Sequence, residues 1–129
     1  MNRDDYISIR RAEERGFYLN HRNKILPSGR ESVKHFIIKA LIGKILYERG
    51  YGFVTEAPVS VGPEVAYIDV FDYCNGIAYE IQTIVHEGIK EAKKELYKSE
   101  VVKDVIIIDL NRISNEIFLA YRQLQKLII

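Results

Sequence analysis

The sequence has few of the residues that build disulfide-stabilised or zinc-stabilised proteins. Its 129 residues include one cysteine, Cys74, and no tryptophan. A single cysteine excludes an intramolecular disulfide and a cysteine-rich zinc site, and it agrees with a reducing compartment. No stretch of about 18 uninterrupted apolar residues is present, and the start MNRDDYISIRR lacks the apolar core of a signal peptide. We therefore expect a soluble cytoplasmic protein that does not bind a membrane.

The chain also lacks a strong excess of one charge, because 19 Lys and Arg residues face 18 Asp and Glu residues. Composition therefore neither favours nor excludes nucleic-acid binding, and any charge asymmetry must be local. A chain of this length is expected to form one domain, residues 1–129, with a core large enough to fold without disulfides. The many Ile, Lys and Glu residues are typical of a thermophilic source or of an AT-rich genome.

Hydrophobic periodicity predicts a series of helices and strands. The first helix is expected over 4–16 and the second within 28–50, where Gly50 is the C-terminal cap. Ser28 and Glu31 have the spacing of a capping box at the start of the second helix. Further along, the pattern predicts strands at 52–60, 64–74, 77–83 and 103–110, and helices at 85–97 and 115–128.

This order of elements predicts an α/β fold with a mixed central sheet flanked by helices. The N-terminal helix and a basic connection occupy residues 1–30, and an αβββαβα core occupies 31–129. The sequence has no internal repeat and no low-complexity tract that would indicate another architecture.

The stretch AYEIQT, residues 78–83, is typical of a half-buried strand whose Glu80 and Gln82 share one face. The dipeptide Asn75-Gly76 before it favours a two-residue type I′ turn, so this strand is expected to pair with the preceding one. The length of the turn fixes which residues of the two strands lie opposite each other.

With a two-residue turn, Asp69 lies directly across from Gln82, and Glu80 lies across from Phe71 on the same face. Asp72 falls on the reverse face. Two carboxylates held close together in a partly buried place repel each other unless a cation lies between them. Mg²⁺ suits such a site, since it takes one or two carboxylates and keeps several waters. A bound divalent ion could activate water for attack on phosphorus.

These features carry a family resemblance. An aspartate in one strand, a tight turn and EIQ in the next strand, after a helix that bears a glutamate, resemble the PD-(D/E)XK nuclease superfamily. The order αβββαβα from residue 31 onward is similar to the restriction endonuclease-like core of that family. The resemblance implies a DNA endonuclease that hydrolyses phosphodiester bonds with Mg²⁺ or Mn²⁺. The small size looks most like archaeal or viral Holliday junction resolvases, which implies branched DNA as a substrate and a homodimer.

The resemblance also implies roles for individual residues. Asp69 and Glu80 would be metal ligands, and the backbone carbonyl of Ile81 would be a third. Glu31 resembles the additional glutamate of junction resolvases, which helps to bind the metal or its water. Gln82 would take the position of the family's lysine and orient water or phosphate.

Gln82 departs from the family pattern, because glutamine offers neutral groups where lysine brings a positive charge. Lys90 or Lys93, on the helix that follows, could supply that charge. Two alternatives stay open: a catalytically inactive nuclease-like module that binds nucleic acid or a partner protein, and an unrelated α/β fold whose hairpin mimics the motif.

Basic residues concentrate near the N-terminus, with Tyr6, Phe17 and Tyr18 interleaved. Such a patch could neutralise phosphates while its aromatic rings stack on exposed bases, although a solvated helix face has a similar composition. The residues that we expect to contact nucleic acid are Arg10, Arg11, Arg22, Lys24, Arg30, Lys90 and Lys93.

Several residues also have plainer interpretations. An exposed edge strand would explain Glu80 without any site, and the capping box alone would explain Glu31. Glu56 could point into the same cleft or pair with a surface lysine, and we expect the surface pair. His86 could be a general base or a helix-start residue, and we expect the helix-start residue. We expect His35 to be an ordinary surface residue.

Overall fold

The computed structural model describes residues 22–97 and 101–129. The expected N-terminal helix and two of the expected DNA contacts, Arg10 and Arg11, lie outside these ranges. None of the helices within the two ranges combines the length and the apolar character needed to cross a bilayer. The elements are α2 (Val33–Glu48), β1 (Phe53–Val61), β2 (Glu64–Asp72), β3 (Ile77–Gln82), α3 (Ile89–Leu96), β4 (Asp104–Asp109), the short 3₁₀ helix η1 (Leu110–Arg112) and α4 (Ile117–Leu127).

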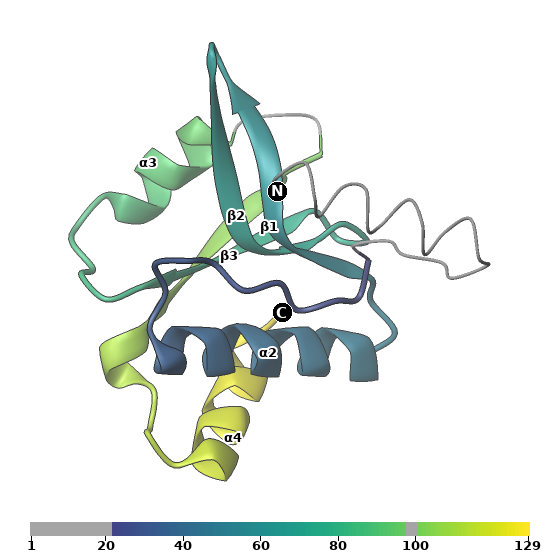
Figure 1. Ribbon diagram of the computed structural model, residues 1–129, viewed down its shortest axis with the longest axis vertical. Helices are drawn as coiled ribbons and strands as arrows, with labels where there is room; N and C mark the ends of the chain where they lie inside the picture. The colour runs from purple at the N-terminus through teal and green to yellow at the C-terminus, as the bar shows by residue number, and fades with distance from the viewer. Residues whose placement is uncertain (1–21, 98–100) are drawn as a thin grey trace.

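The four strands form one mixed sheet in the order β1-β2-β3-β4. β1, β2 and β3 are antiparallel neighbours, whereas β4 runs parallel to β3. The parallel pair needs a crossover, which contains α3. Figure 1 shows α2 lying across one side of the sheet, with α4 beyond it. The predicted α/β class and mixed sheet are confirmed, and the order αβββαβα expected from residue 31 matches the observed elements.

Helix α2 starts later than the capping box predicts. Its N-cap is Ser32, whose side chain accepts a hydrogen bond from a backbone N–H of the first turn. The Ser28 N–H still donates to the Glu31 carboxylate at 2.8 Å, so this pair stabilises the turn before the helix instead of the helix itself. After the helix, Gly50 has a φ of 81° and ends it as expected.

The two later helices are shorter than predicted. Helix α3 follows Gly88, whose left-handed backbone ends the preceding loop. Helix α4 follows Glu116, whose carboxylate accepts the N–H groups of Phe118 and Leu119 at 3.0 and 2.7 Å. A local side-chain cap therefore fixes the start of α4 two residues inside the predicted range.

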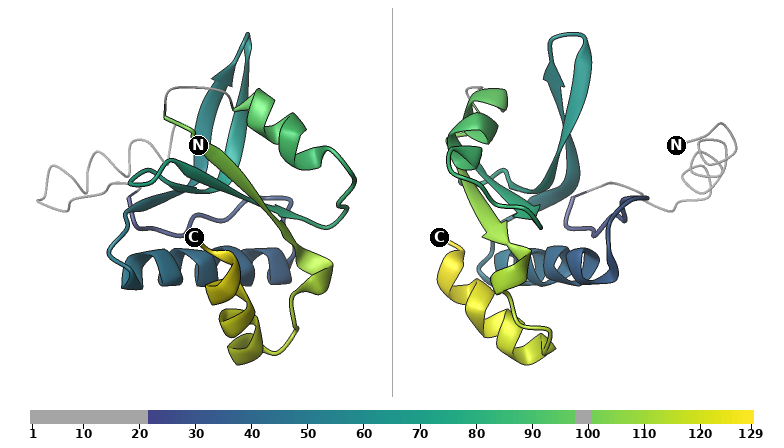
Figure 2. Two further views of the ribbon diagram at one scale, coloured as in Figure 1. Left: turned by 180° about the vertical axis from the view of Figure 1, so that it is seen from behind. Right: turned by 90° about the vertical axis from the view of Figure 1, so that its left-hand side faces the viewer.

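The buried side chains form two clusters that the sheet separates. The first joins α2 and α4 to strand residues such as Tyr79 and Ile108, and the second packs Tyr97, at the end of α3, against Ala78 and Val105. Neighbouring strand residues belong to different clusters because side chains alternate between the faces. Figure 2 shows the helices distributed around the sheet in this way. The sheet therefore has helices on both faces.

β1 and β2 bend midway along their length. Phe53 packs in the first cluster and Ala57 in the second, although their even spacing would place both on one face of a regular strand. Val70 and Ile68 of β2 divide in the same way. The change coincides with Glu56, which has a φ of 49°, a left-handed conformation that is unusual for a residue other than glycine. Beyond the bend the hairpin projects from the body of the protein (Figure 1).

The turn between β2 and β3 also differs from the prediction. Four residues, 73–76, connect the strands, because Asp72 pairs with Ile77. The Asp72 carboxylate accepts the backbone N–H and the side-chain amide of Asn75 at 3.0 and 2.8 Å. These bonds hold Asn75 inside a wider turn, and the predicted two-residue turn is wrong.

The wider turn shifts the register of the hairpin by two residues. Phe71 pairs with Ala78 and not with Glu80, so the expected pairing of Asp69 with Gln82 is also wrong. A shift of two residues keeps every side chain on its predicted face. Continuing the observed register by one position past Val70 and Tyr79 sets Asp69 opposite Glu80.

The first cluster predicts which residue docks α4. Leu124 is fully buried, whereas Leu127 on the same helix is 46% exposed. We expect Leu124→Ala to lower the free energy of unfolding by about 2 to 5 kcal/mol, and Leu127→Ala by less than about 1 kcal/mol. Urea unfolding followed by circular dichroism measures both. Equal losses in the two variants would contradict this packing of α4.

Candidate active site

Two carboxyl groups meet at the middle of the sheet. Asp69 on β2 and Glu80 on β3 lie opposite each other, and the predicted convergence of these two acids is therefore present, through a register different from the one expected. The Ile81 N–H donates to Asp69 Oδ2 at 2.8 Å and holds that carboxylate against β3. The metal-binding role expected for the Ile81 carbonyl stays a prediction.

Glu80 is the most deeply buried of the site acids. Only 2% of its surface is exposed, and its Oε1 atom is buried without a hydrogen-bond partner among the described residues. Burial, and then the negative charge of Asp69, raise the pKa of Glu80 to about 8, although the Tyr97 hydroxyl and the charge of Lys93 oppose the change. Its surroundings therefore favour the neutral, protonated form of Glu80, in a place where a cation could replace the proton.

Asp69 has the opposite electrostatic environment. Burial acts to raise its pKa, but the nearby His35 imidazole and the hydrogen bond from the Ile81 N–H outweigh that effect and lower it. His35 Nε2 lies 3.6 Å from Asp69 Oδ1, and its Nδ1 lies 2.9 Å from Glu31 Oε2. The nearby Asp69 carboxylate raises the pKa of His35 despite the partial burial of the ring. The interpretation of His35 as an ordinary surface residue is wrong.

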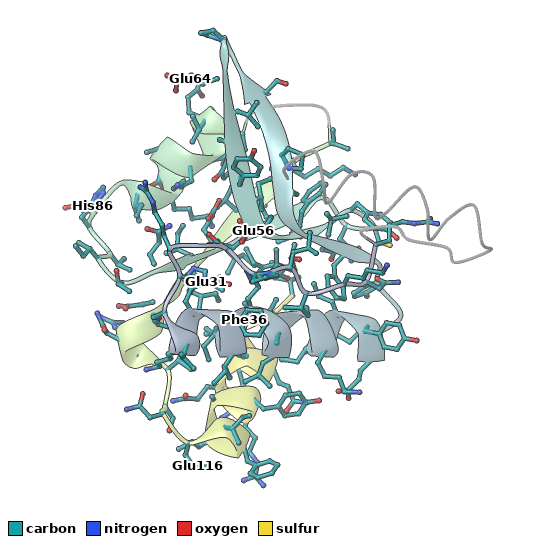
Figure 3. The ribbon with its side chains drawn as sticks, in the orientation of Figure 1. Glu31, Phe36, Glu56, Glu64, His86 and Glu116 are labelled. Carbon is teal, nitrogen blue, oxygen red and sulfur yellow. The ribbon has the colours of Figure 1, made fainter. Side chains whose placement is uncertain are left out.

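A buried lysine lies beside these groups. Lys39 is completely buried, and its Nζ lies 2.7 Å from Glu31 Oε2 and 3.0 Å from Glu56 Oε1. The expected pairing of Glu56 with a surface lysine is wrong, because its partner is this buried ammonium. Figure 3 shows Glu31 and Glu56 in the region between α2 and the sheet, whereas Glu64 and His86 lie at the periphery.

Glu31 connects the two parts of the site. One of its oxygens accepts from the Ser28 N–H, and the other contacts both His35 and Lys39. Burial acts to raise the pKa of Glu31, but the bonds from Lys39 and Ser28 outweigh it and lower the pKa. Glu31 therefore stabilises the turn before α2 and also belongs to the site, and its metal-related role stays a prediction.

Lys39 is the residue that the sequence analysis missed. Glu31, His35 and Lys39 are spaced by four residues, which places them along one face of a helix or its entry turn. Lys39 follows Ile38, a residue of the core, so a charged side chain here interrupts an apolar stretch. The four-residue spacing of these charged residues, together with a lysine inside an apolar stretch, could have identified Lys39 from the sequence.

The remaining predicted residues lie around this centre. Gln82 is partly exposed and pairs in register with Asp109 at the end of β4. Lys90 lies 3.7 Å from Asp104, and Lys93 Nζ lies 5.7 Å from the centre of the Tyr97 ring. Of the two lysines expected to compensate for Gln82, Lys93 acts on Glu80 through its charge, whereas Lys90 pairs with Asp104.

The other basic residues expected to contact DNA lie on the surface. Arg22, Lys24 and Arg30 are exposed, and they belong to the segment that runs beside α2 and β1. His86 is also exposed, and its Nδ1 lies 3.0 Å from the Glu87 carbonyl, in the loop before α3. The expectation that His86 starts the helix is wrong, because α3 begins three residues later, at Ile89. DNA contact by the basic residues stays a prediction.

The donor set fits a small hard cation held by few protein ligands. In the described ranges, no group of three or more His, Cys, Asp or Glu side chains is arranged to enclose a metal ion. Asp69 and Glu80 remain as a facing pair, and Glu80 contributes the buried Oε1 atom. Mg²⁺ is commonly held by one or two carboxylates, with water and substrate phosphate completing its six positions. The two acids fit that kind of site.

The raised pKa of Glu80 predicts a pH-dependent stability. Between pH 4.5 and about 8, the unfolded chain releases the Glu80 proton while the folded protein retains it, so the folded state loses stability as pH rises. Glu80→Gln keeps a neutral group of the same shape. Its stability advantage over the wild type should grow across this interval by on the order of 3 kcal/mol.

Urea unfolding at several pH values measures that difference. Glu64→Gln, on an exposed glutamate of the same sheet, is the matched control and should differ from the wild type by less than about 0.5 kcal/mol at every pH. A difference between Glu80→Gln and the wild type that stays constant from pH 4.5 to 8 would contradict the described environment of Glu80.

Comparison with known proteins gave no significant match: no protein-family model matches the chain, and neither does any curated protein or solved structure. No residue role is therefore transferred from a relative. The functional assignment depends on the geometry of the site and on the resemblance of its motif.

Proposed function

We propose that this protein is a metal-dependent DNA endonuclease of the PD-(D/E)XK type, with a restriction endonuclease-like core. The observation that carries the proposal is the buried Glu80 carboxyl, which faces Asp69 from the neighbouring strand and has one oxygen without a partner among the described residues. Two acids in this arrangement favour a cation between them, because a shared cation removes their repulsion and satisfies the free oxygen.

Asp69 and Glu80 would hold Mg²⁺ or Mn²⁺, with the Ile81 carbonyl as a further ligand. When bound, a divalent cation supplies a Lewis acid that lowers the pKa of water and offsets the charge developing on the phosphate. The Ile81 N–H and His35 hold the Asp69 carboxylate in one orientation. Gln82, two residues beyond Glu80, would orient water or a phosphate oxygen with its neutral amide.

The remaining groups would bind the substrate. Exposed Lys24, Arg30 and Lys90 can neutralise backbone phosphates without reading sequence. Branched DNA as the substrate, and a homodimer as the active form, follow from the resemblance to junction resolvases alone. Both are included in the proposal on the basis of that resemblance.

The alternative is a nuclease-like module without catalysis, and one observation favours it. Lys39 already pairs with Glu31 and Glu56, so half of the acidic cluster is neutralised without a metal. In that case neither Asp69 nor Glu80 would bind a divalent ion, and their substitution would leave DNA or protein binding unchanged.

Cleavage assays decide between the two functions. Labelled duplex, single-stranded and four-way-junction DNA are incubated with the protein in Mg²⁺, Mn²⁺ or EDTA. We expect cleavage of at least one substrate that requires the divalent ion. Asp69→Asn should lower its rate by more than about a hundredfold, because losing a metal ligand costs more than losing its supporting partner.

Asp104→Asn is the matched control, since Asp104 is an aspartate of β4 paired with surface lysines. It should leave the rate within about threefold of the wild type, because exposed ion pairs contribute little. Metal-dependent cleavage that survives Asp69→Asn would refute the assignment of the ligands. No cleavage of any substrate, together with no Mn²⁺ binding, would favour the module without catalysis.

A further inference from the structure

We propose that Lys39, from helix α2, supplies the fixed positive charge that Gln82 cannot provide, and that it acts as a positioning residue for the cleavage reaction. This inference rests on the proposed function. It concerns a residue outside the strand motif, in a part of the chain separated from Gln82 by two strands of the sheet.

The first argument is the cost of burying this side chain. Lys39 has no exposed surface, although an ammonium group loses several kcal/mol of hydration when it is buried. An apolar residue at this position could join the core of α2 at no such cost. Buried charged groups of this kind are often found where function needs the charge.

The second argument is where the ammonium points. Both of its carboxylate partners belong to the site, since Glu31 also contacts His35, and Glu56 lies across from Asp69 in the β1–β2 register. Glu56 has a left-handed backbone at the bend of β1, and its carboxylate accepts a hydrogen bond from the Lys39 ammonium. The backbone therefore adopts an unusual conformation where this contact is made.

The third argument is the charge of the whole cluster. The cluster contains four carboxylates, those of Glu31, Glu56, Asp69 and Glu80, together with the Lys39 ammonium and the His35 imidazole, and Lys93 acts on Glu80 from the edge of the cluster. With every acid ionised and His35 protonated, two negative charges remain, which one divalent cation neutralises. Without Lys39 the cluster would keep an excess negative charge beside a bound cation, and this charge would repel the phosphodiester. Lys39 thus allows a polyanion to approach an acidic site.

Other cations are less well placed for this task. Lys90 pairs with Asp104, outside the cluster. Lys93 lies over the Tyr97 ring and is half-buried, so it lacks the complete burial of Lys39. Lys39 is held by two ion pairs at 2.7 and 3.0 Å. A preorganised charge contributes more to catalysis than a mobile one, because it needs no reorganisation during the reaction.

The test compares Lys39→Met with Lys39→Met combined with Gln82→Lys, on whichever DNA substrate the wild type cleaves. We expect Lys39→Met to lower kcat by about a hundredfold or more. KM should change little, and Mn²⁺ affinity by titration calorimetry should not weaken, because the acids remain. Adding Gln82→Lys should restore the rate at least about tenfold, since it returns a cation to the site.

One substitution serves as the matched control. Lys44→Met removes an exposed lysine of the same helix and should retain a rate within about threefold of the wild type. Wild-type activity in Lys39→Met, or a folded, metal-binding Lys39→Met that Gln82→Lys does not rescue, would overturn the inference. A larger loss of rate in Lys93→Met than in Lys39→Met would also overturn it, because Lys93 would then be the main cation of the site.

If Lys39→Met does not unfold cooperatively, Gln82→Lys in the otherwise unchanged protein provides the test. With Lys39 in place the charge is already present, so a second cation at position 82 should bring no gain in rate. A gain of about a hundredfold would show that the cation was missing and would overturn the inference. The proposed function is tested by a different result: it is refuted if the wild type cleaves no DNA with either Mg²⁺ or Mn²⁺.

Discussion

The facing carboxyl groups of Asp69 and Glu80 are the constraint around which the site is arranged. Both acids lie on strands at the centre of the sheet, where burial removes the water that would otherwise solvate them. Asp69 stays ionised because His35 and a backbone N–H stabilise its charge, whereas Glu80 is forced toward the neutral form. Two equivalent acids thus acquire different protonation states from their surroundings. A cation between them would ionise both.

Helix α2 and its entry turn add a second set of charges to this pair. They place Glu31, His35 and Lys39 along one side, facing the sheet. These residues also stabilise the fold, since Glu31 holds the turn before α2 and Lys39 joins α2 to β1 through Glu56. Stability and site chemistry therefore share the same contacts, which is why the proposed tests measure folding and metal binding beside cleavage.

The sequence predicted the order of the elements well, because apolar periodicity and the glycine after α2 are local signals. It did not predict the register of the hairpin, since the Asn75-Gly76 pair favours a short turn that the Asp72 side chain replaces with a wider one. The two acids still met, because the shift of two residues preserved the faces. Lys39 and the bend at Glu56 depend on contacts distant in the chain, which single-residue patterns do not encode.

A crystal of the protein soaked in Mn²⁺, with its anomalous scattering recorded, would test the central claim most directly. The account predicts a peak within bonding distance of both Asp69 and Glu80, with the Glu80 Oε1 atom as one of the ligands. An anomalous map without a peak between these two carboxyl groups, or with the manganese bound elsewhere on the protein, would contradict it.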